Sequence, residues 1–417
     1  MEKQNLGVNV NSEIGKLEAV VIHSMGSEVE NMTPENAERA LYSDILNLSV
    51  AQDEYSDFRG VLRKNAQVYE VQDLLKEVLE DETAKNDLLA KVCSSCKHSN
   101  IVDNIYYQSP AQLAKLLIEG VELNRDNLTR FLSNQRFAIR PLHNFFFTRD
   151  SSMAIENEIL VGHMASSVRE REAQIMETIF KNSKIFNTKI FEIENKLNSN
   201  DIKIEGGDVL VAGKDLLVIG ISARTSTQGI DKIIKNFKLR KIDKHIIVQE
   251  LPTDRESFIH LDMVFTFLNY DECMVYEPVI MQPNRFRTIH IQIENGKIKI
   301  SEEKNILECL KKIGRDMKPI YCGGTADLWT QEREQWHSGA NFFALSPGKV
   351  IGYSRNVYTI DEMNKNGYEV IAATDIIQNK VSIDDYKKCV ITIEGSELSR
   401  GGGGARCMTM PVRRQDF

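Results

Sequence analysis

The end of the chain places a cysteine where chemistry is possible. The segment "SRGGGGARCMTMPV" runs from Ser399 to Val412 and sets Cys407 behind four consecutive glycines, an alanine and an arginine. Four adjacent glycines are costly to order, so this stretch is either a frayed tail or a loop whose backbone must lie close to something else. In the second case the thiol points at a ligand, and its thiolate could act as a nucleophile.

Three other polar segments interrupt apolar ones. In "FIHLDMVFTF", His260 and Asp262 are two residues apart, a spacing that puts both on one face of a strand. The plainer alternative is a satisfied His–Asp pair on an exposed face. "IEGGDVL" carries Glu205 before two glycines, which permit close backbone approach or simply make a hairpin turn. "HNFFFTRD" ends in Asp150, which could equally be a surface residue at the end of a strand.

Together these groups predict a site for a cationic substrate. His260 could transfer protons to and from the reacting groups. Carboxylates beside a thiolate would repel it and raise its pKa, an arrangement that makes sense if the substrate is a cation. A guanidinium has five N–H donors in a planar fork, and such a fork suits paired carboxylates.

Two further patterns carry little weight. "CSSCKH", Cys93–His98, begins like a zinc site, but no second CxxC or HxxxH follows it. "RGGGGARC" lacks the Lys-Ser/Thr of a phosphate-binding loop and opens no helix. We therefore expect neither a metal nor a nucleotide at these segments.

The elements that must position these residues differ along the chain. "KLEAVVIHSMG" predicts a buried strand and a turn, Pro34–Asn65 predicts a helix, and Ala66–Val71 returns to strand. Residues 72–143 read as helical throughout. Within them "SPAQLAKLLIEG" has Ser109 as helix N-cap, proline at the first helical position and a glycine stop.

Beyond residue 145, short strands alternate with helices and glycine turns, and several strand pairs read as hairpins. A doubly wound parallel sheet would use fewer hairpins and more crossovers. Repeated ββα-like units favour a ring or propeller of small sheets, although no exact period repeats.

Composition sets the broad class. The chain has 417 residues, 42% hydrophobic and 27% charged, as in ordinary soluble proteins. That length suggests several domains, or one large pseudo-symmetric domain with an insertion. A net charge of −8 disfavours nucleic acid and anionic membranes as partners. With no secretory signal or long apolar run, and seven scattered cysteines, we expect a cytoplasmic protein with free thiols.

The segments, taken in order and spacing, resemble the bacterial arginine deiminase family of the guanidine-modifying (amidinotransferase-like) superfamily. Each motif is weak alone, but the resemblance runs nearly end to end. The motifs that carry it are "NSEIGKLEAVVIH", "MTPEN", "YSDILNLSVAQDEYSDFRGVLR", "FTRD", "EGGDVL", "HLDMVFT", "YCGG", "QWHSGANFFALSPGKVIGYSRN" and "GSELSRGGGGARCMTMPVRR".

The resemblance implies a fold and a reaction. The fold is a five-bladed pseudo-symmetric α/β propeller of ββαβ-type units, one catalytic domain over residues 1–417, with an α-helical bundle inserted at 72–143. The reaction is hydrolysis of free L-arginine to L-citrulline and ammonia through a covalent thiouronium intermediate, without metal or organic cofactor. The enzyme would be a homo-oligomer, either a dimer or a tetramer.

The resemblance also assigns roles to residues. Cys407 would be the nucleophile and His260 the acid/base, with Glu205 assisting His260, and Asp150 and Asp262 would grip the guanidinium. Asn144 and Phe147 match substrate-contacting positions, Arg169 and Arg224 match arginines that bind the α-carboxylate, and Asp208 would support the site. Some relatives carry a further substrate arginine where this chain has Gly402, and "SART", "HNFFFTRD" and "HSMG" also depart from common family patterns. These departures bear on affinity more than on chemistry.

Two alternatives remain at this point. One is another guanidine hydrolase, acting on agmatine or peptidylarginine; the helical insert and the two arginines argue for free arginine instead. The other is a catalytically silent interaction protein on the same fold, against which the intact set of five catalytic residues argues.

Overall fold

A computed structural model describes residues 5–33, 42, 44–94, 105–193, 201–253 and 255–416. The first part of the helix predicted from Pro34 and most of "CSSCKH" therefore lie outside the described residues. None of the helices in the described part has the length and apolar character needed to cross a membrane.

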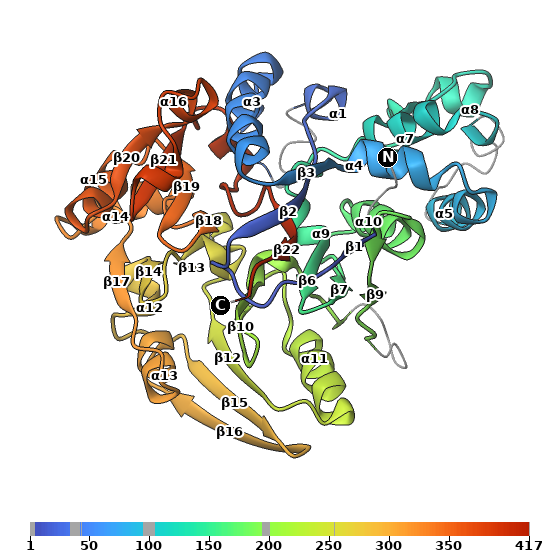
Figure 1. The fold of residues 1–417 in the computed structure, drawn as a ribbon. Coiled ribbons are helices and arrows are strands. Elements are labelled where there is room, and N and C mark those ends of the chain that lie inside the picture. Colours follow the sequence, from blue (N-terminus) through green and yellow to red (C-terminus); the bar gives the residue numbers. More distant parts are fainter. Residues whose placement is uncertain are drawn as a thin grey trace.

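Five sheets of three or more strands surround a common centre in the described ranges (Figure 1). In each, a first pair of strands is antiparallel and the next pair is parallel. The strands of the first sheet lie side by side in the order β22 (Met410–Arg414), β2 (Leu17–Ile22) and β3 (Gln67–Glu70), and those of the second in the order β6 (Ser152–Ile155), β7 (Glu158–Val161) and β9 (Lys189–Ile190). The third sheet has the order β10 (Val209–Gly213), β11 (Leu216–Ile221), β12 (Lys244–Glu250), β15 (Thr288–Glu294) and β16 (Lys297–Glu303). The fourth has β13 (Phe265–Phe267), β14 (Glu272–Val275) and β17 (Lys318–Tyr321), and the fifth has β18 (Phe343–Ser346), β19 (Lys349–Tyr353), β21 (Cys389–Ile393) and β20 (Glu369–Ala372).

A helix lies between the two parallel strands of each sheet in sequence, and these helices lie outside the ring of sheets, with α10 in turn covered by α4 and α5 (Figure 1). In sheet order they are α3 (Leu48–Asn65), α10 (Glu170–Asn182), α11 (Thr227–Arg240), α13 (Ile306–Lys312) and α15 (Val357–Lys365). Helix α11 shows why they form: Ser226 caps it, and Ile230, Ile233, Ile234 and Phe237 line one buried face.

The central strands are buried on both faces. Along β11, Leu216 and Val218 belong to one apolar cluster, while Leu217 and Ile219 belong to the neighbouring one. Because alternate side chains of a strand point to opposite faces, such a strand must be apolar throughout. This explains the continuous run "LLVIGI".

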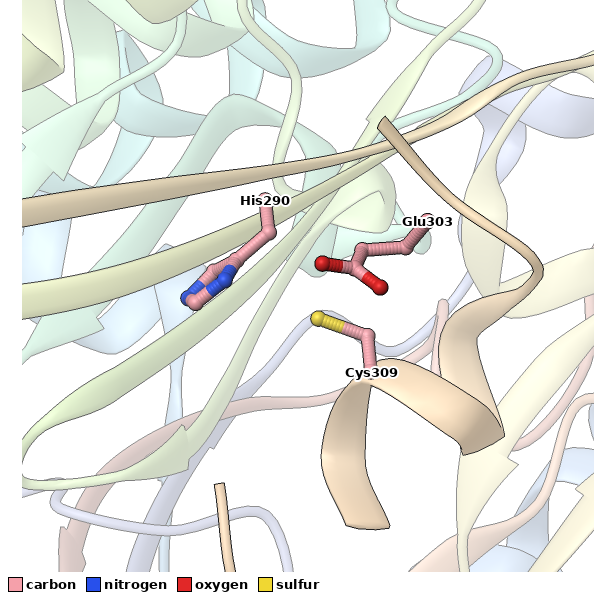
Figure 2. A group of neighbouring side chains, drawn as sticks. All are labelled: His290, Glu303 and Cys309. Atoms are coloured by element: carbon pink, nitrogen blue, oxygen red, sulfur yellow. The ribbon is translucent and has the colours of Figure 1, made fainter. Parts of the chain in front are cut away.

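The third sheet carries an extension, the hairpin β15–β16, which forms its outer edge. His290 of β15 and Glu303 of β16 face Cys309 of α13 across this hairpin (Figure 2).

Several sequence predictions are confirmed locally and others are wrong. Strands β2 and β3 lie where they were predicted, and helix α7 (Pro110–Glu119) has Ser109 as its N-cap. Helix α3, however, begins only at Leu48, because Asn47 caps it, and the described residues 44–47 are not helical.

Residues 72–143 are not helical throughout. They hold most of α4 (Val71–Val78), α5 (Glu82–Ser94), α7 and α8 (Leu128–Phe131), but also a small antiparallel pair, β4 (Val121–Glu122) and β5 (Phe137–Ile139). The division of the chain into a catalytic domain and an inserted bundle stays a prediction.

The remaining elements are short connections and one minor sheet. The minor sheet pairs β1 (Leu6–Gly7) with β8 (Phe186–Asn187) in parallel. The other helices are α1 (Ser27–Glu30), α9 (Thr148–Ser151), α12 (Glu277–Ile280), α14 (Leu328–Trp336) and α16 (Ala373–Ile377).

Candidate active site

A small pocket, with a cavity volume of about 20 Å³, lies where the sheets meet. Eight of the eleven residues expected at the site line it: Asn144, Phe147, Asp150, Arg169, Arg224, His260, Gly402 and Cys407. The other three, Glu205, Asp208 and Asp262, are fully buried beside them. Ile259, Gly401 and Gly403 complete the lining.

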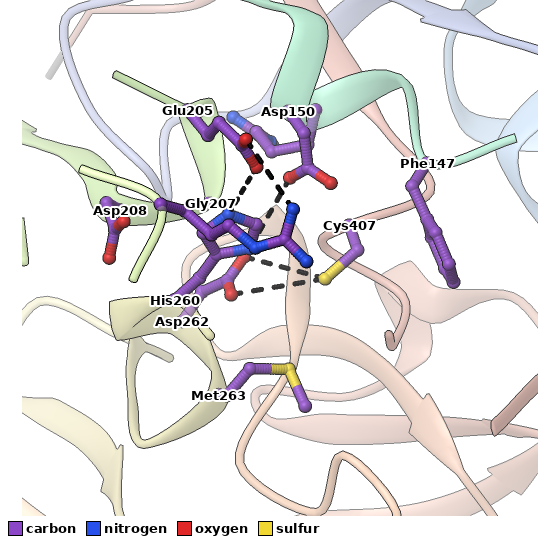
Figure 3. Close-up of polar contacts among 12 residues, drawn as sticks. Phe147, Asp150, Glu205, Gly207, Asp208, His260, Asp262, Met263 and Cys407 are labelled. Atoms are coloured by element: carbon purple, nitrogen blue, oxygen red, sulfur yellow. Dashed lines mark hydrogen bonds and ion pairs between the residues drawn. The ribbon is translucent and has the colours of Figure 1, made fainter. Parts of the chain in front are cut away.

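Several site side chains sit in segments that lead into the first strand of a sheet, whereas Arg169 and Arg224 follow the second strands β7 and β11. Asp150 precedes β6, Glu205 precedes β10, Asp262 precedes β13 and Cys407 precedes β22. Asn341 holds the corresponding place before β18. The five sheets therefore each deliver a side chain to one central point, and most of these residues converge in Figure 3.

The thiol of Cys407 lies between a carboxylate and an amide. Its Sγ is 3.7 Å from Oδ2 of Asp262 and 3.2 Å from Nδ2 of Asn341. Burial raises the pKa of the Cys407 thiol well above its usual range, and the negative charges of Asp262 and Asp150 raise it further. The thiol therefore needs a nearby cation to ionise.

His260 is held between two carboxylates. Its Nε2 is 3.0 Å from Oε2 of Glu205, and its Nδ1 is 3.6 Å from Oδ1 of Asp150. Burial alone would lower the pKa of His260, but Asp150 and the hydrogen bond with Glu205 raise it to about 9. Burial disfavours the charged form of Glu205, yet the hydrogen bond and charge of His260 lower its pKa to about 2. At neutral pH the pair is an imidazolium and a carboxylate.

The local backbone around His260 differs from the strand that was predicted. Leu261–Met263 forms one turn of 3-10 helix, and β13 begins only at Phe265. Asp208 fixes this turn, because its Oδ1 accepts a hydrogen bond of 2.8 Å from the backbone N–H of Leu261. His260 and Asp262 still both face the site, but through this turn rather than through strand alternation.

The glycines of "EGGD" allow the backbone to approach a neighbouring side chain closely, which was one of the two interpretations of this segment. Gly206–Asp208 forms a 3-10 turn, and a Cβ at Gly207 would lie 2.4 Å from Nδ1 of His260. Any side chain there would displace the imidazole. Asp208 itself is buried behind this turn and accepts a hydrogen bond from Ser222, and burial raises its pKa to about 7.

The two predicted carboxylate-binding arginines differ in how strongly they are held. The guanidinium of Arg169 contacts Oδ2 of Asp150 at 2.6 Å and Oε2 of Glu172 at 2.7 Å. It also donates to the carbonyls of Asn144 and Phe147. Arg224 makes a looser ion pair with Oε1 of Glu205 at 3.8 Å. Arg224 is therefore the freer of the two cations at the pocket.

The glycine loop is packed, so the frayed-tail reading of the sequence is wrong. Gly401 and Gly403 lie against the ring of Phe147, and Tyr353 donates a hydrogen bond to the carbonyl of Gly403. Gly402 has a positive φ of 82°, which a side chain rarely adopts. Strand β22 then pairs with β2 and anchors the segment that follows Cys407.

Sequence reasoning missed two buried residues. Asn341 accepts hydrogen bonds from the backbone N–H groups of Arg406 and Cys407, at 2.9 and 3.3 Å, while its amide donates toward the Cys407 sulfur. Arg406 donates to Oδ2 of Asp262 at 2.8 Å and to both oxygens of Glu13 at 3.0 Å. Asn341 could have been predicted as a site residue because it is a polar residue just before a buried strand. Arg406 could have been predicted because it is adjacent to Cys407.

The geometry suits a guanidinium better than a metal ion. Asp150, Glu205 and His260 each offer a ligand atom within 4.8 Å of the others. His260 carries a proton at neutral pH, however, and arginines already contact both carboxylates. Oδ1 of Asp150 is buried and accepts no hydrogen bond from the described residues, so it can take one from an entering cation.

Comparison with known proteins adds independent findings. The family described as "Arginine deiminase" matches residues 38–414. Proteins named arginine deiminase from Limosilactobacillus reuteri and Streptococcus pneumoniae are each 33% identical over 430 aligned residues, covering 98% of both chains.

Solved structures share the fold at low sequence identity. SxtG, an amidinotransferase from Microseira wollei, aligns with a TM-score of 0.53 at 14% identity over 98% of both chains. The N-terminal domain of ArgZ, a cyanobacterial arginine dihydrolase, aligns with a TM-score of 0.51 at 12% identity over 95% of this chain and 98% of that one. The mixed α/β architecture is thus that of the amidinotransferase fold.

Proposed function

The chain belongs to the arginine deiminase family and is a hydrolase that converts arginine to citrulline, and we propose that it does so through a covalent intermediate on Cys407. One observation carries this proposal. The Cys407 thiol, the protonated His260 and the carboxylates of Asp150 and Asp262 converge on one buried pocket.

Substrate binding activates the nucleophile. The guanidinium of arginine enters between Asp150 and Asp262 and donates hydrogen bonds to the unpaired Oδ1 of Asp150 and to the carboxylate of Asp262, where it replaces the Cys407 thiol as donor. Its positive charge offsets the two carboxylates that keep the pKa of Cys407 high, so the thiol loses its proton to solvent and becomes a thiolate. The volume of the pocket, about 20 Å³, is far smaller than an arginine, so the lining residues move to admit the substrate.

The chemical steps then use Cys407 and His260. The thiolate attacks the central guanidinium carbon, and His260 donates its proton to the departing amino group, which leaves as ammonia. The product of this step is a thiouronium cation bonded to Cys407, beside a neutral His260. A water molecule enters, His260 removes one of its protons, and the resulting hydroxide attacks the same carbon. The carbon–sulfur bond breaks and its electron pair returns to Cys407 as a thiolate. The proton of the new hydroxyl group passes to that thiolate, which restores the thiol, and citrulline leaves.

Glu205 keeps His260 suited to this cycle. The hydrogen bond between Glu205 and Nε2 of His260 favours the imidazolium and fixes the orientation of the ring. The ring must still lose its proton in the first half-reaction, which the positive charge of the thiouronium adduct promotes, and it takes a proton from water in the second.

Arg224 is a better candidate than Arg169 for binding the α-carboxylate of free arginine. It lines the pocket and has one loose ion pair, whereas Arg169 is held by two carboxylates and two carbonyls. Arg169 must leave Oδ2 of Asp150 if both oxygens of that carboxylate are to bind the substrate. Asn144, Phe147 and Gly402 line the same pocket and contact the aliphatic part of the substrate in this proposal.

We further propose that the five sheets are the blades of a five-fold pseudo-symmetric α/β propeller with a helical bundle at 72–143. The common strand order of the five sheets and the delivery of one site residue by each support this. The buried free cysteines Cys273, Cys322 and Cys389 suit a reducing, cytoplasmic setting. A homo-oligomeric state stays a prediction.

One assay tests the proposal. Ammonia release and the ureido product are measured with free L-arginine, agmatine and an arginine-containing peptide, and the acid-quenched enzyme is examined by mass spectrometry for an adduct on the peptide that contains Cys407. Turnover of free arginine with such an adduct supports the proposal. Preference for agmatine or peptide points to another guanidine hydrolase, and no ammonia or ureido product from any of the three substrates points to a silent interaction protein.

A further inference from the structure

Three side chains outside the active site converge at the edge of the third sheet. His290 comes from β15, Glu303 from the end of β16 and Cys309 from α13, and Figure 2 shows all three pointing toward one another. One ligand atom of each lies within 4.8 Å of the other two. The reaction described above uses none of these residues.

We propose that His290, Glu303 and Cys309 bind a divalent zinc ion. Imidazole nitrogen, thiolate sulfur and carboxylate oxygen are the donors that zinc takes in proteins. Magnesium and calcium prefer oxygen ligands alone, so the thiol and the imidazole together select a softer ion.

The backbone places these ligands without strain. In the β15–β16 hairpin His290 lies opposite Ser301, and Glu303 is two residues beyond Ser301 on the same strand. His290 and Glu303 are therefore diagonal neighbours on one face of the sheet. Helix α13 follows β16 after a short turn and brings the buried Cys309 over that face.

A second histidine supports the first. Nδ1 of His245 is 2.9 Å from Nε2 of His290, and the two rings are stacked with centroids 5.0 Å apart. When Nε2–H of His290 donates to His245, the lone pair of Nδ1 of His290 is free for a metal. A hydrogen bond from the second ring nitrogen is the usual support of a metal-binding histidine.

The charges around the cluster set the conditions for binding. A metal that binds Cys309 displaces the proton of its thiol, which passes to solvent. Lys312 pairs with Oε2 of Glu303 at 2.5 Å, and Lys299 also faces the cluster. Zinc therefore competes with Lys312 for Glu303.

A bound ion would act on stability rather than on turnover. The β15–β16 hairpin is the outer edge of its sheet, and Ile298 and Ile300 on β16 are exposed. Zinc would join both strands of this hairpin to α13. Ligands that bind only the folded state raise the melting temperature, so zinc should do so here.

The experiment uses the full chain in a Cys407→Ser background, which removes the nucleophilic thiol from the metal assay. Gel-filtered protein is titrated with Zn²⁺ and, separately, with Co²⁺, whose thiolate charge-transfer absorption reports sulfur ligation. The measurements are the metal-to-protein ratio, the absorption band and the melting temperature. The expected result is one equivalent of metal, a thiolate band and a higher melting temperature with Zn²⁺.

Variants locate the site. Cys309→Ser should abolish the thiolate band and weaken binding at least about tenfold, and His290→Ala should weaken it similarly. Cys96→Ser is the matched control for the "CSSCKH" segment and should leave the band and affinity unchanged. The proposal is overturned if no metal binds, if the band survives in Cys309→Ser, or if it is lost in Cys96→Ser. Retention of full affinity in His290→Ala would equally overturn it.

Discussion

Glu13 and Arg406 lie 393 residues apart in the chain, yet their side chains form a buried two-point ion pair. Nε and Nη2 of Arg406 are each 3.0 Å from a carboxylate oxygen of Glu13. Nη1 of the same guanidinium contacts Oδ2 of Asp262 at 2.8 Å. The beginning and the end of the chain are thereby joined directly behind the nucleophile, so a residue far from the substrate can control the position of Cys407.

The first prediction concerns Glu13→Ala. It should lower the free energy of unfolding by about 3–5 kcal/mol, because it leaves the Arg406 guanidinium buried with one carboxylate fewer. It should also lower kcat, because Arg406 adjoins Cys407. Urea unfolding and steady-state kinetics measure both. The matched control is Glu18→Ala, which breaks the half-exposed pair with Arg413 and should cost no more than about 1 kcal/mol.

The same pair has a defined pH dependence. Burial disfavours the charged form of Glu13, but Arg406 and Arg149 lower its pKa to about 2, against 4.5 for the unperturbed group. A carboxyl group with a depressed folded-state pKa contributes stability above its unfolded pKa and loses it as pH falls through the folded value. The stability difference between wild type and Glu13→Ala should therefore shrink between pH 4.5 and 2. A difference that stays constant over that range would contradict an ionised Glu13.

The second prediction concerns the alkaline limit of activity. With a pKa of about 9, His260 holds the proton needed by the departing ammonia up to that pH. The value of kcat/KM should therefore fall as pH rises above about 9. Glu205→Gln removes one of the anions that raise the pKa of His260, so the fall should begin at a lower pH. Rate profiles between pH 6 and 10 test this, and an unshifted alkaline limb in Glu205→Gln would refute the role given to that pair.

Much of the site could be predicted because its residues interrupt apolar segments. Asp150, Glu205, His260 and Cys407 each stand beside residues that must be buried, so each signals an ionisable group in a core. The shape of the backbone could not be predicted in the same way. Leu261–Met263 turns where alternation predicted a strand, since a hydrogen bond from the backbone N–H of Leu261 to the distant Asp208 and the packing of His260 on Gly207 fix that turn.

The missed residues show a second limit. Asn341 and Arg406 form hydrogen bonds with residues far away in the sequence, and no local sequence pattern indicates which residues those are. The pairing of Arg169 with Glu172 was within reach, since the two residues are three apart at the start of a helix. The antiparallel pair β4–β5 was not predicted from the sequence because its strands are only two and three residues long.

The third prediction concerns Asn341. Asn341→Asp keeps the oxygen that accepts from the N–H groups of Arg406 and Cys407, but it replaces the amide donor to Sγ with a negative charge. That charge should raise the pKa of Cys407 further and lower kcat/KM by about tenfold or more. Asn341→Ala should lose the loop contacts as well. Iodoacetamide labelling of Cys407 against pH reports the thiol pKa, and labelling identical to wild type in Asn341→Asp would contradict this role.

The fourth prediction concerns the nucleophile. Cys407→Ser should abolish citrulline formation while the far-ultraviolet circular dichroism stays that of the wild type, because an alcohol is a far weaker nucleophile here. His260→Ala should be comparably impaired, since both half-reactions transfer a proton. Substantial turnover by Cys407→Ser would exclude the covalent route, and a change in KM alone for His260→Ala would exclude its role as acid and base.

The fifth prediction separates the two arginines by substrate choice. Arg224 is loosely paired at the pocket, so a charge-assisted hydrogen bond from it to the α-carboxylate of arginine, worth roughly 1.5–3 kcal/mol, is within reach. Agmatine lacks that carboxylate. Arg224→Ala should therefore lower kcat/KM for arginine by about tenfold or more and leave agmatine nearly unchanged, so that the preference for arginine narrows.

Arg169→Ala should behave differently. It removes a cation that contacts both Asp150 and Glu172, and it leaves two buried carboxylates without it. Arginine and agmatine turnover should then fall together, and the melting temperature should drop as well. The test is kcat/KM for both substrates in wild type and both variants, with thermal melts in parallel. If Arg224→Ala leaves the ratio of kcat/KM for arginine to that for agmatine unchanged, Arg224 does not bind the carboxylate. If Arg169→Ala alone lowers that ratio, the carboxylate is bound by Arg169. The contact between Arg169 and Asp150 must then break when substrate enters.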